Sequence, residues 1–118
     1  MTKILIAEDD PQMLSLLATL LEIEGFDVCE YSETTPIAQT VKTEQPAIVL
    51  LDIHLSNENG LEVSRQIKNN PTTRGTCVIL QSGMDLEDAS KAAQANHFLL
   101  KPYMPETLID LLHSVANT

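Results

Sequence analysis

Short apolar runs alternate with segments of helical periodicity along this chain, and that alternation limits its fold more than any other feature. Aliphatic and β-branched strands separated by helices are typical of repeated βα units and a parallel sheet. We expect strands at 3–7, 27–30, 47–51, 76–80 and 97–100, and helices at about 11–24, 35–44, 59–69, 86–95 and 105–116.

The runs at 47–51 and 76–80 are almost wholly apolar, as expected for central strands that helices cover on both faces. Because crossover connections are right-handed, five such strands have few arrangements. The commonest is an open sheet in the order 2-1-3-4-5, so we expect an α/β fold of the flavodoxin-like (βα)5 type, a doubly wound parallel five-stranded sheet. A length of 118 residues predicts a single domain, residues 1–118.

The net charge of −10, from 17 acidic and 7 basic residues, excludes one class of partner. The basic residues are scattered singly, and such a surface repels a phosphate backbone, so we expect no direct binding of nucleic acid. The first residues form neither a signal peptide nor a membrane span, which predicts a cytoplasmic protein without membrane contact. Cys29 and Cys77 lie on strands that two others would separate, so we expect free thiols.

Three of the expected helices have a proline at or near their start, and two of these prolines follow a residue that can cap the helix. Asp10 precedes Pro11, which predicts an N-cap followed by proline at the first helical position. The pair at 35–36, Thr-Pro, repeats this signal for the second helix. Met104 precedes Pro105 but has no group that can cap, so the start of the last helix should depend on packing.

Polar side chains follow four of the five expected strands. The carboxyl ends of parallel strands meet at one edge of the sheet, where such folds bind their ligands. Taken alone, an acid here could be a helix cap, a serine a turn residue and a lysine a solvated side chain, but an aspartate directly after a buried strand is harder to dismiss. The residues are Glu8, Asp9 and Asp10, then Asp52, Ser82 and Lys101.

This combination of side chains predicts phosphoryl chemistry. A cluster of carboxylates favours a hard cation, Mg²⁺ or Mn²⁺, over zinc, because His54, His97 and His113 share no ligand spacing. A carboxylate nucleophile, a metal ion, a hydroxyl donor and a lysine are together the groups needed to hold a phosphoryl group on an aspartate.

The chain resembles a receiver domain of the bacterial two-component response regulators over essentially its whole length. The spacing is close to the family's, with 43 residues from Asp9 to Asp52 and 30 from Asp52 to Ser82. The motifs that carry the resemblance are "ILIAEDDP", "AIVLLDIHLSNENGLEV", "VILQSG" and "FLLKPY".

By position, the resemblance implies a phosphoacceptor and a metal site. Asp52 would be the phosphoacceptor and a metal ligand, and Asp9 a second direct ligand. Glu8 would bind the metal through water, and the main-chain carbonyl of His54 would be the third protein ligand. The cofactor would be Mg²⁺, with Mn²⁺ as an alternative, and Asp10 would be left for the helix cap.

The resemblance also implies a switch. Ser82 and Lys101 would bind phosphoryl oxygens, and Phe98 would be the aromatic residue that moves when Ser82 is drawn inward. The bond between Lys101 and Pro102 is expected to be cis. Two departures stand out: Ser56 occupies a position where proline is common, which predicts a looser loop, and the 19 residues from Ser82 to Lys101 predict a short or displaced fourth helix that lacks the family's glycine.

The implied function is a phosphorylation-activated switch in a two-component phosphorelay. The donor would be a sensor histidine kinase or a histidine phosphotransfer protein, and the surface of helix four, strand five and helix five would act on a downstream effector or a covalently linked output domain. The chain would catalyse its own phosphorylation and dephosphorylation rather than act as a turnover enzyme. Whether it forms a dimer is left open.

Three other functions compete with this one. A receiver-like scaffold that binds partners without phosphorylation would not need the intact acid, serine and lysine set. An FMN-binding flavodoxin would want a loop rich in Ser, Thr and Gly after the first strand, where this chain has three acids. A metal-dependent phosphatase with an aspartyl nucleophile would want a second acid two residues after Asp52, where His54 stands instead.

Overall fold

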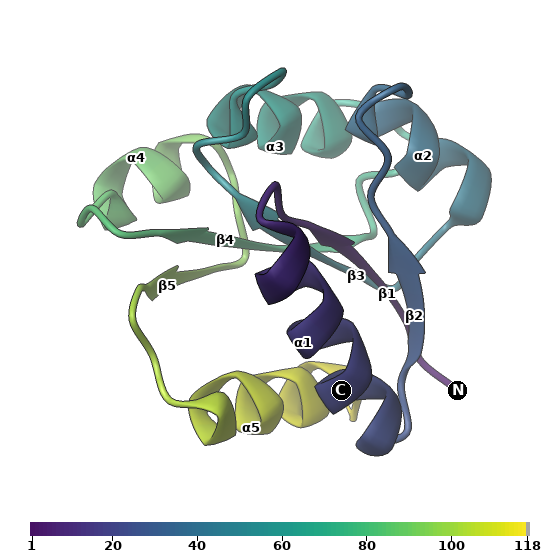
Figure 1. Cartoon of the computed structure of the whole chain (residues 1–118). Coiled ribbons are helices and arrows are strands. Elements are labelled where there is room, and N and C mark those ends of the chain that lie inside the picture. Colours follow the sequence, from purple (N-terminus) through teal and green to yellow (C-terminus); the bar gives the residue numbers. More distant parts are fainter. Residues whose placement is uncertain (118) are drawn as a thin grey trace.

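The computed structural model describes residues 1–117 and contains a sheet of five parallel strands in the order β2-β1-β3-β4-β5 (Figure 1). The predicted fold class and strand order are therefore confirmed. The strands are β1 (Lys3–Ala7), β2 (Asp27–Glu30), β3 (Ile48–Asp52), β4 (Cys77–Ser82) and β5 (His97–Leu100). The helices are α1 (Pro11–Ile23), α2 (Ile37–Glu44), α3 (Gly60–Lys68), α4 (Glu87–Ala92) and α5 (Pro105–Ala116).

The helices form two layers around the sheet. In Figure 1, α1 and α5 lie on one face, and α2, α3 and α4 lie on the other. Successive strand residues alternate between these layers: Leu5 packs in the cluster with α2 and α3, whereas Ile4 and Ile6 pack in the cluster with α1 and α5. All five residues of β3 are buried, as expected for a central strand covered on both faces.

The first two helices begin differently from each other. The side chain of Asp10 accepts hydrogen bonds from the amides at the start of α1, so the predicted cap is confirmed. The Thr-Pro signal for α2 was wrong, because the helix starts one residue later, at Ile37, with Pro36 in the cap position. The carboxylate of Glu58 accepts the Ile37 N–H at 3.0 Å, so a residue from a distant loop supplies the missing acceptor.

Helices α4 and α5 show the short length and the missing side-chain cap that the sequence predicts for them. Helix α4 has only six residues, so the expected range 86–95 was too long, whereas the expectation of a short fourth helix is confirmed. Gln94 follows it with φ of 66°, a left-handed conformation that glycine adopts more easily. Met104 makes no side-chain cap for α5, as expected.

The remaining backbone and thiol predictions also hold. The peptide bond between Lys101 and Pro102 is cis. Cys29 and Cys77 are both free cysteines. Within residues 1–117, no helix has the length and apolar character needed to cross a membrane.

Candidate functional site

A lysine bridges two buried carboxylates at the carboxyl edge of the sheet. The ammonium of Lys101, just after β5, donates to Asp52 Oδ2 at the end of β3 and to Glu8 Oε1 just after β1, the latter at 3.3 Å. Asp52 is 6% exposed and Glu8 is 7% exposed. Two carboxylates withdrawn from water need compensating charge, and Lys101 supplies it.

Main-chain amides hold the other oxygens of these two carboxylates. Asp52 Oδ1 accepts the N–H of His54 at 2.9 Å, and Glu8 Oε2 accepts the N–H of Asp9 at 3.0 Å. The His54 side chain itself is exposed. Each carboxylate is therefore fixed from two sides.

Asp9 is held by a different partner. Its Oδ2 accepts both donors of Ser56, the main-chain N–H at 2.6 Å and the hydroxyl at 2.9 Å. Its Oδ1 is buried and has no hydrogen-bond partner among the residues described. Ser56, where a looser loop is expected, ties the β3–α3 loop to Asp9 through two groups that a proline lacks.

Ser82 lies at the end of β4, and Phe98 lies on the neighbouring strand β5. Ser82 is 1% exposed at the end of β4, and its Oγ accepts the N–H of Met84 at 3.0 Å. Its carbonyl accepts the N–H of Lys101 at 2.8 Å, which connects β4 to the lysine. Phe98 on β5 is half-buried and lines a cavity of about 220 Å³ beside α4.

The two carboxylates alter the acidity of the groups around them. Burial disfavours the charged form of Lys101, but the hydrogen bond and charge of Asp52, followed by those of Glu8, outweigh burial and raise the pKa of Lys101 above its usual value. Burial, followed by the charges of Glu8 and Asp52, raises the pKa of Tyr103 to about 12. Both groups are therefore protonated at neutral pH.

The donor atoms fit a hard cation. Within the described part of the chain, no three side chains of His, Cys, Asp or Glu surround a common cation position. The predicted set does not need three, because it combines the carboxylates of Asp9 and Asp52 with a main-chain carbonyl. The unpartnered, buried Oδ1 of Asp9 is an oxygen that a divalent cation would satisfy.

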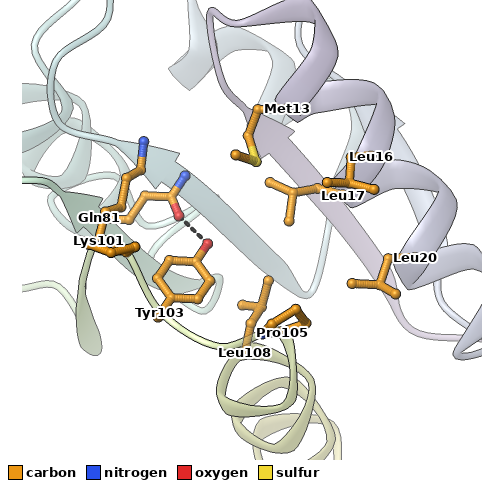
Figure 2. A pocket seen from close by; sticks show the side chains of 10 residues that line it. Met13, Leu16, Leu17, Leu20, Gln81, Lys101, Tyr103, Pro105 and Leu108 are labelled. Atoms are coloured by element: carbon orange, nitrogen blue, oxygen red, sulfur yellow. Dashed lines mark hydrogen bonds between the residues drawn. The ribbon is translucent and has the colours of Figure 1, made fainter.

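An apolar groove of about 250 Å³ adjoins the site between α1 and α5. Figure 2 shows leucines of α1 on one side and Tyr103, Pro105 and Leu108 on the other. The Tyr103 hydroxyl donates to the buried side chain of Gln81, whose Nε2 has no hydrogen-bond partner among the residues described (Figure 2). Lys101 lines this groove as well, so one side chain belongs both to the groove and to the carboxylate site.

Sequence reasoning missed two residues that shape the site. Gly60, the first residue of α3, packs so closely on the end of β3 that a Cβ there would lie 2.6 Å from the carbonyl oxygen of Asp52. Only a glycine after the capping Asn59 hinted at this contact. The hydrogen bonds from Ser56 to Asp9 join residues 47 positions apart, and no local pattern announces them.

A family model for the response regulator receiver domain matches residues 4–113. The chain belongs to the response regulator receiver domain family. Its fold, with five parallel strands in this order and five helices, is that of a flavodoxin-like receiver domain.

Two curated relatives resemble this receiver domain. It is 34% identical to the response regulator ArlR of Staphylococcus saprophyticus over 99% of this chain and 53% of ArlR. It is 30% identical to protein PilH of Pseudomonas aeruginosa over 98% of both chains. The receiver domain thus spans about half of ArlR and nearly all of PilH.

A solved structure shares the fold at lower identity. It is the receiver domain of the Pseudomonas aeruginosa sensor histidine kinase PA1611, with a magnesium ion coordinated in its active-site cleft. The TM-score is 0.88 at 19% identity, and the match covers 99% of this chain and 98% of that one.

Proposed function

We propose that this receiver domain is a phosphorylation-activated switch in a two-component phosphorelay. Asp52 would take a phosphoryl group from the phosphohistidine of a sensor histidine kinase or a histidine phosphotransfer protein, in a reaction that depends on Mg²⁺. The observation that carries the proposal is the Lys101 ammonium placed between the buried carboxylates of Asp52 and Glu8. A scaffold without phosphoryl chemistry would not need this arrangement.

The residues that would hold the cation are Asp9 and Asp52 directly, the main-chain carbonyl of His54, and Glu8 through water. The bound Mg²⁺ or Mn²⁺ would supply positive charge that offsets a phosphoryl group placed among acids. The magnesium ion of the PA1611 receiver domain supports this choice of metal.

The chemical step is an in-line displacement at phosphorus. A carboxylate oxygen of Asp52 forms the new O–P bond while the P–N bond breaks, and its electron pair stays on the imidazole nitrogen of the donor. Lys101 already contacts Asp52 and can move its hydrogen bond to a phosphoryl oxygen. Ser82 Oγ accepts from Met84, so its own proton is available for another phosphoryl oxygen.

The switch would follow from these new bonds. Movement of Ser82 toward the phosphoryl group vacates space beside β5, into which Phe98 can turn, and this changes the surface of α4, β5 and α5. A shift from a mostly inactive to a mostly active population needs about 5 kcal/mol, which a few charge-assisted hydrogen bonds can supply. The recipient would be a downstream effector or an attached output domain.

The phosphohistidine partner would dock over the apolar groove between α1 and α5. Lys101 lines that groove and contacts Asp52, so an occupant of the groove would lie next to the lysine that holds the phosphoacceptor. Met13 and Leu16, both exposed on α1, would meet apolar side chains of the partner.

Intact-mass spectrometry tests the proposal. We expect incubation with Mg²⁺ and acetyl phosphate, or with a phosphohistidine donor, to add the mass of one phosphoryl group. The Asp52→Asn variant and a sample with EDTA should show no gain. A chain that gains no mass with any donor would instead be a scaffold, and a gain that persists in Asp52→Asn would place the phosphoryl group elsewhere.

A further inference from the structure

We propose that Ser56 is a positioning residue that orients Asp9 for the divalent cation. This inference rests on the proposed function, because it assigns a role in the same metal site. It concerns a position where the family commonly has a proline and where this chain has two hydrogen-bond donors instead.

The geometry divides the two oxygens of Asp9 between two tasks. Oδ2 accepts both the N–H and the hydroxyl of Ser56, at 2.6 Å and 2.9 Å, and these two donors occupy its lone pairs. Oδ1 is buried and has no hydrogen-bond partner among the residues described, so it is the oxygen left for a cation. Rotation of the carboxylate would break both bonds to Ser56.

The loop that carries Ser56 is anchored independently of Asp9. Beyond Ser56, the carboxylate of Glu58 accepts the first N–H of α2, and the side chain of Asn59 caps α3. Gly60 then packs against the Asp52 backbone. Ser56 therefore presents its two donors from a fixed support, as the outer groups around metal sites commonly do for the ligands they hold.

Ser56 could instead compete with the cation for Asp9, and its removal would then raise the affinity for the metal. Ser56 withdraws negative charge from Oδ2, and if the cation needed that oxygen, removal of the serine would strengthen metal binding. Because the two donors and the unpartnered position lie on different oxygens, we expect their removal to weaken metal binding instead.

Calorimetric titration of Mg²⁺ into the whole chain tests the inference. Ser56→Pro removes both donors, and we expect it to weaken Mg²⁺ binding by about tenfold, the lower end for loss of an outer group at a metal site. Ser56→Ala keeps the N–H and should lose about threefold. Ser56→Thr keeps both donors, so its affinity for Mg²⁺ should stay close to that of the unsubstituted chain.

Two controls separate positioning from stability. Glu58→Gln removes a charge from the same loop but keeps a side-chain oxygen that can accept the Ile37 N–H, so the loop stays anchored. Its Mg²⁺ affinity should stay within about twofold of the unsubstituted chain because the removed charge is screened by salt. Thermal unfolding in EDTA reports stability without metal. Each titration is run well below the unfolding temperature that the variant shows in EDTA, so the chain is folded during the measurement. A weaker affinity of Ser56→Pro for Mg²⁺ then reports the metal site and not a loss of folded protein.

The outcomes distinguish this inference from the proposed function. Equal or tighter Mg²⁺ binding in both Ser56→Pro and Ser56→Ala, alongside normal binding in the unsubstituted chain, would overturn the role of Ser56 and leave the metal site intact. A Ser56→Thr variant that binds Mg²⁺ as weakly as Ser56→Pro would also overturn the role of Ser56. If the unsubstituted chain binds no Mg²⁺, or Asp9→Asn binds it equally well, the metal site of the proposed function fails and this inference fails with it.

Discussion

The first half of the chain, β1 to α3, starts its helices in a different way from the second half, β4 to α5. In the first half, a carboxylate or amide side chain accepts the first N–H groups of every helix: Asp10 for α1, Glu58 for α2 and Asn59 for α3. In the second half, Leu86 and Met104 occupy the cap positions and neither side chain makes a cap hydrogen bond. Asp85 accepts the first N–H of α4 at 3.4 Å, a longer contact than the 3.0 Å between Ile37 and Glu58 at the start of α2. The helix starts of the second half are therefore held more weakly.

The two halves also carry residues with different proposed roles in the site. The first half carries Asp9 and Asp52, whose positions would have to be set before a cation and a phosphoryl group arrive. The second half carries Ser82, Lys101 and Phe98, which the proposed switch would move. Segments that move are drawn from the less stable parts of a protein, where few hydrogen bonds have to be broken. The comparison predicts that the first half keeps its structure on phosphorylation, whereas the second half changes.

The largest effect should come from a crowded glycine in the first half. Gly60→Ala puts a Cβ 2.6 Å from the backbone oxygen of Asp52, and we expect a loss of about 3 kcal/mol in the free energy of unfolding. Gly75→Ala is the matched control, because no atom lies within 4 Å of its Cβ. Urea unfolding measures both, and equal losses in the two variants would show that the contact between α3 and β3 is not tight.

A smaller effect should come from Tyr103 in the second half, which is partly buried beside the charges of Glu8 and Asp52 and donates to Gln81. The pKa of Tyr103 is raised from 10.0 to about 12, so the neutral phenol is favoured in the folded state. This contribution is fully present below the unfolded pKa and is lost as the pH rises from about 10 to about 12. Tyr103→Phe should lack this part of the pH dependence.

Urea unfolding at two pH values checks the prediction. Between about pH 9 and about pH 11, we expect the unsubstituted chain to lose about 1 kcal/mol more stability than Tyr103→Phe does. An identical pH dependence in the two chains would mean that the phenol titrates at its ordinary pKa.

Effects of at most about 1 kcal/mol should come from exchanging cap signals between the halves. Met104 is 63% exposed, and Met104→Ser would give α5 the cap that it lacks, with an expected gain of about 0.5 kcal/mol. Asp10→Ala should lose about 1 kcal/mol, because α1 loses its cap acceptor. Chemical denaturation measures both, and a loss of stability in Met104→Ser would show that packing by the methionine matters more than the missing cap.

The elements that the sequence predicts well are those with local signals. The apolar runs mark all five strands, and the side chains that follow β1, β3 and β5 meet as expected, with Lys101 contacting Asp52 and Glu8. The short fourth helix follows from a count of residues, and the cap of α1 from the pair Asp10-Pro11.

Two of the contacts that sequence reasoning missed join segments that are distant along the chain. Glu58 caps a helix that begins 21 residues earlier, and Ser56 holds an aspartate 47 residues earlier. The steric demand on Gly60 exists only because α3 starts against the end of β3. Such contacts depend on how the β3–α3 loop folds over its neighbours, which no residue pattern encodes locally.

Amide NMR of the whole chain, with Mg²⁺ and with or without acetyl phosphate, tests the central claim most directly. We predict that phosphorylation shifts amides throughout Ser82 to Met104, including α4 and Phe98, while α1 and α2 change little. Asp52→Asn should show none of these shifts. Shifts confined to the neighbours of Asp52, or equal shifts in Asp52→Asn, would contradict a switch that runs from this aspartate into the second half of the chain.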